Sequence, residues 1–283
     1  MKHVSLALLL TVCSAPVWAQ VADEREGDRF RITLLHESER KGENGSSGRS
    51  SGRHEYIEQI LAVRQDGIER LYDIPREPDD EDHLIDWQFP VRVFEANDGK
   101  MGIVNRGDLE RRRDAWLEAA EIPMEACGAW YFTWNAFQVE CDPDAILETI
   151  RTIRIQPKSL KDGASFTHPA AIQPGSLHKL ADDSSKFSSE MEVNEDYFHR
   201  AEAQSDVIVG EIMRKPVTFE EAYARRKAEQ ITGTIEVVLT TSEGGRVLRR
   251  LTTIETTKTE VGGEVEHETS TETIERKRIE LGR

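Results

Sequence analysis

The sequence has no apolar run long enough to cross a bilayer, since a spanning helix needs about 20 consecutive apolar residues. The Leu-rich run at residues 4–12 falls well short of that length and contains Ser5 and Thr11. We therefore expect a protein without a transmembrane segment.

Basic residues are outnumbered, with 37 Lys and Arg against 53 Asp and Glu and a formal net charge of −16. Such an acidic chain repels phosphate backbones and anionic lipid surfaces over a Debye length. We expect neither nucleic acid nor an anionic membrane as a partner. Cations and basic proteins are more compatible with this charge, although acidity also simply favours solubility.

Catalytic and metal-binding motifs are absent at the required spacing. Gly48–Gly52 has the letters of a nucleophile elbow, but no hydrophobic strand precedes it. Asp79–His83 is rich in carboxylates, yet five consecutive residues cannot surround one ion. The histidines show no zinc-binding spacing. We therefore predict no catalytic, cofactor-binding or metal-binding residues and no cofactor.

Two weaker candidates remain. Arg111–Arg113 forms a basic island on an expected helix, which salt bridges to neighbouring acidic residues explain, with an anion or partner site as the alternative. For an enzyme, His36, His54 and Glu58 are the residues of the first half to inspect.

Residues 1–19 have the parts of a cleavable secretory signal peptide. A basic start precedes the apolar segment, and Val17 and Ala19 occupy the −3 and −1 positions of a cleavage site. We expect cleavage between Ala19 and Gln20 and a periplasmic or secreted protein. Cleavage removes one basic and no acidic residue, which leaves 36 basic against 53 acidic groups and a charge of −17.

Cysteine is scarce: the chain has three, of which Cys13 lies in the expected signal peptide. Lipidation of Cys13 is an alternative, but Val12 poorly matches the small residue that a lipobox needs. In an oxidising compartment the remaining pair, Cys127 and Cys141, predicts a disulfide. Its Cα atoms must lie about 4.4–6.8 Å apart, so residues 128–140 must double back. Two buried thiols or an intermolecular bridge are the alternatives.

The densest aromatic stretch of the chain lies between these two cysteines. One interpretation is a core hairpin pinned by the disulfide. The other is a surface that contacts a sugar ring, an apolar ligand or a protein partner. A loop that folds back cannot easily bury aromatic side chains on both faces, so the second interpretation stays open. Its contact residues are Trp130, Phe132, Trp134 and Phe137.

Alternation of apolar and polar residues predicts a β-rich protein. The expected strands are 28–39, 53–63, 68–74, 87–95, 101–104, 232–241, 246–258 and 264–281, with a Gly/Ser-rich loop at 41–52. The last strand is dominated by Thr and Glu, which is typical of an edge strand or of one that lines a polar surface. Expected helix starts are Asp108 as an N-cap, Asp142-Pro143, and a capping box from Thr218 to Glu221, whereas 193–213 fits a helix or a strand.

These elements predict an α+β fold of mainly long antiparallel strands, in a curved sheet or partial barrel with a few short packed helices. The expected divisions are a β-rich domain with two helices at 20–155, a linker or surface excursion at 156–190, and a helix plus a three-stranded meander at 191–283. The meander could complete the same sheet.

Export, acidity and the lack of catalytic spacing predict a non-catalytic protein that acts by binding or supports the cell envelope. Its partner would be an unknown envelope protein or a small apolar ligand. One alternative is a carrier or chaperone for an apolar ligand or protein in a half-barrel cavity. The other is an uncharacterised hydrolase.

Overall fold

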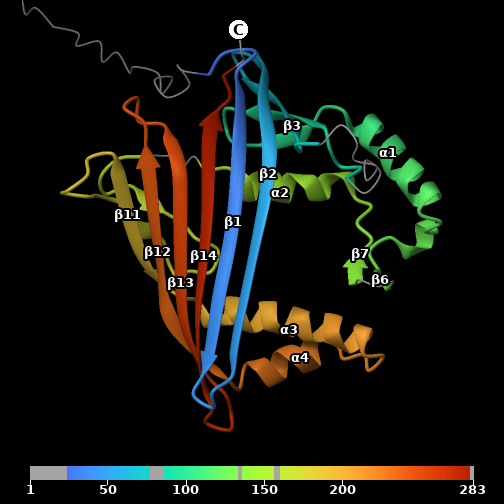
Figure 1. The fold of residues 1–283 in the computed structure, drawn as a ribbon, viewed down its shortest axis with the longest axis vertical. Helices are drawn as coiled ribbons and strands as arrows, with labels where there is room; N and C mark the ends of the chain where they lie inside the picture. Colours follow the sequence, from blue (N-terminus) through green and yellow to red (C-terminus); the bar gives the residue numbers. More distant parts are fainter. Residues whose placement is uncertain (1–23, 77–85, 133–135, 156–159, 281–283) are drawn as a thin grey trace, which may run out of the picture.

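A ten-stranded antiparallel sheet dominates the computed structural model, which describes residues 24–76, 86–132, 136–155 and 160–280 (Figure 1). Its strands are β1 (Arg29–Gly42), β2 (Ser47–Val63), β3 (Gly67–Asp73), β4 (Val91–Ala96), β5 (Met101–Ile103), β10 (His178–Lys179), β11 (Lys186–Glu192), β12 (Gln230–Thr241), β13 (Val247–Thr259) and β14 (Val265–Arg278). The order across the sheet is β10-β11-β12-β13-β14-β1-β2-β3-β4-β5. The sheet is open, with the short strands β10 and β5 at its edges.

Four α-helices of the described chain lie on one side of the sheet in Figure 1. They are α1 (Arg106–Ala119), α2 (Ile146–Ile153), α3 (Glu195–Ile212) and α4 (Phe219–Arg226). Short 3-10 turns, Met124–Ala126 and Pro143–Ala145, and two small hairpins, β6 (Trp130–Phe132) with β7 (Ala136–Gln138) and β8 (Ser165–Phe166) with β9 (Gly175–Ser176), complete the fold. A mostly antiparallel sheet with helices on one side agrees with the predicted α+β class.

The hydrophobic core lies between the covered face of the sheet and the helices. Alternation places Phe30 and Ile32 of β1 on this face, while Arg31 between them is exposed. Ile146 and Ile150 of α2 are fully buried in the same core as residues of β12. The alternating apolar residues of the strands and the apolar stripe of α2 therefore pack in the same core.

The expected loop at 41–52 is mostly strand, which corrects the prediction. β1 continues to Gly42 and β2 begins at Ser47, so only residues 43–46 turn. Gly45 adopts a positive φ of 85° there, and the Asn44 side chain accepts a hydrogen bond from the Ser46 backbone at 2.8 Å. Backbone pairing extends the hairpin through polar residues that carry no apolar alternation.

The last strand is central, which corrects the expectation that it lies at an edge. β14 lies between β13 and β1 and pairs with both over most of its length. Its acidic side chains face basic partners across the sheet: Glu272 lies 3.0 Å from Arg250, and Glu266 lies 3.4 Å from Arg40. Polar cross-strand pairs therefore stabilise a strand that has little apolar content.

The helix starts were predicted with mixed success. Thr218 and Glu221 form the expected capping box of α4, and the Asp142 side chain accepts from the Asp144 backbone with Pro143 at the start of the turn. Asp108 is not the N-cap of α1, because the helix already begins at Arg106 and the cap position is Asn105. The Asp108 carboxylate instead lies in the first turn, where the helix dipole favours it.

The ambiguous segment 193–213 is the helix α3 apart from its ends. The Asn194 side chain caps it by accepting a hydrogen bond from the Asp196 backbone at 3.1 Å. The β-favouring run Val207-Ile208-Val209 is helical within it, since capping and packing against α4 override local propensity.

Strands from both β-rich parts of the chain pair in the same sheet, through β14 and β1. The segment between these parts contributes β8, β9 and β10 and buries Ala164, Ala170 and Leu177 in the core. It also lies along β11, where the Ile172 backbone donates a hydrogen bond to the Glu192 carbonyl at 3.0 Å.

Candidate functional site

The predicted disulfide is present. Cys127 and Cys141 are bonded with their Cα atoms 5.5 Å apart. The chain between them doubles back as the short hairpin β6–β7, in which Trp130 pairs with Gln138. The Gly128 backbone donates to the Val139 carbonyl at 2.8 Å, which continues the pairing toward the disulfide.

The aromatic side chains of this disulfide hairpin are described only at Trp130, which is half-buried. The side chains of Phe132 and Phe137 and the whole of Trp134 lie outside the described residues. Contact of these four residues with a ligand or partner therefore stays a prediction. The backbone of β6 lies near α3, which places the disulfide hairpin beside a second exposed element.

That second element is the helical hairpin of α3 and α4. The two helices pack side by side, and Figure 1 shows their connecting loop at the end away from the strands. The last turn of α3 and this loop, residues 209–217, are called the hairpin tip below. Val209, Ile212 and Met213 are 54%, 41% and 62% exposed there. Exposed apolar side chains gathered at one point are typical of a binding surface.

Backbone contacts hold the hairpin tip in shape. Gly210 is buried, and a Cβ atom on it would lie 2.9 Å from the Lys215 carbonyl oxygen. The Lys215 backbone donates to the Gly210 carbonyl at 2.8 Å, and the Met213 backbone donates to the Val209 carbonyl at 2.9 Å. Arg214 adopts a positive φ of 53°, the left-handed conformation that commonly ends a helix. The exposed apolar side chains therefore sit on a defined backbone.

Two basic residues follow the exposed apolar ones. Arg214 and Lys215 are exposed, and neither has an ion pair with any residue that the structure describes. Among the described residues most arginines have an ion pair, and Arg214 is one of the few that do not. The hairpin tip thus combines apolar side chains with positive charge.

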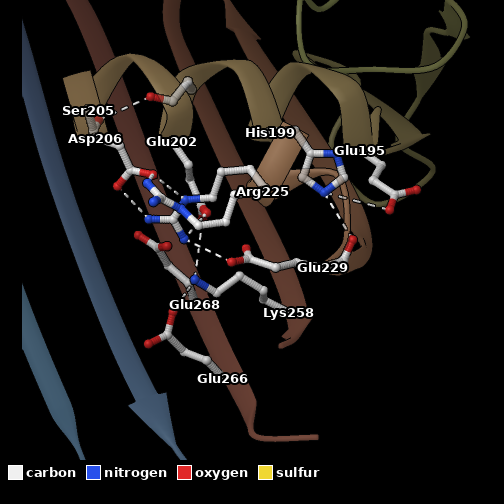
Figure 2. A network of polar contacts seen from close by, with 12 residues as sticks. Glu195, His199, Glu202, Ser205, Asp206, Arg225, Glu229, Lys258, Glu266 and Glu268 are labelled. Atoms are coloured by element: carbon white, nitrogen blue, oxygen red, sulfur yellow. Dashed lines mark hydrogen bonds and ion pairs between the residues drawn. The ribbon is translucent and has the colours of Figure 1, made fainter. Parts of the chain in front are cut away.

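A charged cluster fixes the base of the helical hairpin (Figure 2). Arg226 of α4 lies 2.7 Å from Asp206 and 2.9 Å from Glu202, both on α3. Lys258 of β13 lies 3.4 Å from Glu202 and 3.6 Å from Glu266 of β14. Glu202 therefore joins the helices to the sheet. We call this set of residues the charged base.

Two groups beside the charged base, Glu229 and His199, have unusual surroundings. Burial raises the pKa of the Glu229 carboxyl, and the nearby Glu202 carboxylate adds to this effect, while Arg226 only partly opposes it. His199 is 3% exposed, with Nε2 3.1 Å from the Glu229 carbonyl oxygen and 3.7 Å from Glu195. The ion pairs of the charged base join α3 to α4 and to β13, which suits anchoring of the helices to the sheet.

The residues singled out for an enzyme are not brought together. Glu58 is buried, with its carboxylate 2.6 Å from Arg276 and 2.9 Å from Arg70. His36 and His54 are exposed on β1 and β2, where they pair with Gly52 and Leu34. Glu58 therefore serves an ion network, and the two histidines lie outside it.

The same ion network includes Glu24, near the start of the described chain. Its carboxylate lies 2.7 Å from Arg70 and 3.0 Å from Arg276. Burial alone would raise the pKa of Glu24, but the guanidinium groups of Arg70, Arg276 and Arg246 hold it below its usual value. The network thus ties the beginning of the described chain to the sheet.

The other sequence motifs have structural partners or lie outside the description. Gly48–Gly52 lies within β2, so it lacks the turn into a helix that a nucleophile elbow requires. Arg112 donates to the Pro90 carbonyl oxygen at 2.6 Å, and Arg113 donates to the Cys141 carbonyl oxygen at 3.3 Å. Asp79–His83 lies outside the described residues.

The hairpin tip was missed in the sequence. Its signal is the change from Ile212-Met213 to Arg214-Lys215-Pro216, in which apolar and basic residues adjoin a proline. The ambiguity between helix and strand in this region hid the exposure of its apolar side chains. Within the residues that the structure describes, none of the helices is both long and apolar enough to span a membrane.

Comparisons with known proteins assign no family. No protein-family model matches the chain, and no curated protein matches it. Among solved structures, the chain is similar to one described as "Lipid-protein interactions in lipovitellin", with a TM-score of 0.40 and 10% sequence identity. The match covers 92% of this chain and 26% of the other, so this chain spans about a quarter of that protein's length. At this level of similarity neither a family nor a function follows.

Proposed function

We propose that this protein is an exported, non-catalytic binding protein that contacts a component of the cell envelope through the hairpin tip and the adjacent disulfide hairpin. One observation carries the proposal: Val209, Ile212 and Met213 are exposed together on a backbone that is held in shape by hydrogen bonds. Ordered apolar side chains that remain in water favour association with another surface.

Two further features support this role. The charged base anchors α3 and α4 to the sheet, so the tip is presented on a rigid support. The disulfide between Cys127 and Cys141 suits an oxidising compartment, as the expected signal peptide at residues 1–19 does. Export into the periplasm or medium is part of the proposal.

A carrier in a partial barrel is supported less well. One hollow of about 340 Å³ lies on the uncovered face of the sheet and is lined mainly by charged residues, among them Arg31, Arg53 and Lys277. A second, of about 380 Å³, combines Ile57 and Leu71 with polar side chains. Neither hollow offers a continuous apolar wall, which an apolar ligand needs.

Amide hydrogen exchange with and without envelope membranes of the host cell tests the proposal. We expect exchange to slow at residues 209–217 when membranes are added. The turn around Val261 is the control, since this side chain is 76% exposed but lies between β13 and β14. Unchanged exchange at the tip, or equal slowing at both places, would refute a binding role for the tip.

A further inference from the structure

The hairpin tip has the composition of a surface that inserts into a lipid bilayer interface. Val209, Ile212 and Met213 are exposed together, and Arg214 and Lys215 directly follow them. Apolar side chains enter the boundary between headgroups and acyl chains, while nearby basic side chains meet the lipid phosphates. A protein partner would bury the apolar side chains equally well, so the positive charge of the tip must decide between a lipid bilayer and a protein partner.

The charge of the tip differs from that of the whole protein. Residues 209–217 contain Arg214 and Lys215 against the single acidic residue Glu211, whereas the full chain carries a net charge of −16. Neither basic residue has an ion pair with any part of the chain that the structure describes. These two charges are therefore free to attract an anionic surface.

The distance between the tip and the charged base limits repulsion by the rest of the protein. Seven helical steps separate Asp206 from Met213, a rise of about 10 Å, and eleven steps separate Glu202 from Met213, a rise of about 16 Å. The Debye length at physiological ionic strength is about 8 Å. Acidic groups of the charged base are thus screened at the tip, while Arg214 and Lys215 lie within contact range of whatever the tip touches. The acidity of the charged base therefore acts only weakly at the tip, while Glu220 and Glu221 in the first turn of α4 lie closer to it in the chain.

The conformation of the tip also suits insertion. The buried Gly210 lets the backbone of Lys215 and Val217 approach α3. A Cβ atom at position 210 would lie 2.9 Å from the Lys215 carbonyl oxygen and 3.3 Å from the Val217 backbone nitrogen. Hydrogen bonds to the Val209 and Gly210 carbonyls close the turn. A preformed turn loses little conformational entropy on binding, which favours a small contact surface.

We propose that the hairpin tip docks on anionic phospholipid, with Ile212 and Met213 in the interface and Arg214 and Lys215 on lipid phosphates. This inference deepens the proposed binding function by naming the component that the tip contacts. The attachment is peripheral and depends on the negative charge of the bilayer.

Flotation of the purified mature protein with lipid vesicles tests the inference. One set of vesicles contains equal parts of phosphatidylcholine and phosphatidylglycerol, and the other contains phosphatidylcholine alone. We expect the protein to float with the anionic vesicles and much less with the neutral ones. Binding should fall at an ionic strength of about 1 M, where the Debye length shrinks to about 3 Å. Absence of flotation with anionic vesicles would overturn the inference.

Two tip variants separate the contributions of charge and apolar surface. Replacement of Arg214→Asn together with Lys215→Gln should weaken binding to anionic vesicles by about fivefold for each lost charge. Asparagine tolerates the left-handed conformation at position 214, so the turn should persist. Met213→Gln should weaken binding to both kinds of vesicle, since the Met213 side chain would enter the interface.

Matched controls keep the result specific to the tip. Arg249→Gln removes an exposed charge on the uncovered face of β13, and Val261→Gln removes an exposed apolar side chain between β13 and β14. Both should bind like the unchanged protein, and equal thermal unfolding should show that all variants fold. Equal binding by tip and control variants would overturn the inference. Protection of the tip by detergent-solubilised envelope proteins but not by vesicles would also overturn it, while the proposed binding function would stand.

Discussion

Replacement of Arg70 by methionine should strongly destabilise the protein. Its side chain is 12% exposed and lies 2.7 Å from Glu24, 2.9 Å from Glu58 and 2.7 Å from Glu95. Methionine fills a similar volume but leaves three poorly solvated carboxylates close together. Removal of one partner from a buried ion pair costs about 3–5 kcal/mol. Arg276 still faces Glu58 and Glu24, so we expect a loss at the lower end, about 3 kcal/mol.

Urea unfolding at neutral pH measures this loss. The matched control is Arg49→Met, because Arg49 is 75% exposed and lies 3.9 Å from Glu37. An exposed pair of this kind contributes little to stability, so the control should unfold like the unchanged protein. A similar small effect in both variants would show that the Arg70 network does not stabilise the fold.

The pH dependence of the loss gives a second check. The pKa of Glu24 is held below its usual value in the folded protein, so this carboxylate stabilises the fold above its unfolded pKa and loses that effect as pH falls. Methionine at position 70 removes much of the cause of the lowered pKa. The difference between Arg70→Met and the unchanged protein should therefore shrink as the pH falls through about 4. A difference that stays constant or grows in acid would refute this explanation.

Three further predictions concern the site and its supports. The Glu229→Gln variant should gain stability relative to the unchanged protein as pH rises from about 4 to about 7, because the raised pKa of Glu229 makes its ionisation costly in the folded state. Melting temperatures across this pH range check the prediction, and a difference in melting temperature that does not change with pH contradicts it. Gly210→Ala should lower the free energy of unfolding by about 1–3 kcal/mol in urea, despite the better helix propensity of alanine. Gly262→Ala is the control and should not, because the space around its Cβ position is open, and equal stability of both variants would mean that the tip relaxes freely. Replacement of both Cys127 and Cys141 by serine should cost about 3 kcal/mol, and alkylation of the unchanged protein without reductant should add no mass at these residues; two added groups would show free thiols.

Local sequence was sufficient wherever short-range chemistry decides the structure. The capping box of Thr218 and Glu221 depends on residues three apart, and it is present. Alternation along β1 and β12 predicted strands because apolar side chains two residues apart must share the buried face. The disulfide of Cys127 and Cys141 was also predictable, since few cysteines leave few pairings.

Long-range pairing explains what local sequence missed. The polar ends of β1 and β2 are strands because each pairs with the other, although neither has apolar alternation there. β14 was expected at an edge because it is rich in Thr and Glu, but Arg250 and Arg40 on neighbouring strands balance its charge. A single strand contains no information about such partners, which lie far away in the chain.

The sequence by itself determined the class of the protein: its α+β composition, its acidity, the disulfide and the expectation of export. Only the tertiary structure decided which polar strand is central and where the candidate site lies. Val209, Ile212 and Met213 look like core residues in the sequence, and they are exposed because Arg226 and Glu202 hold α3 and α4 together near the sheet while the helices extend past it. Exposure depends on what packs against a side chain, and that is set by contacts between distant parts of the chain.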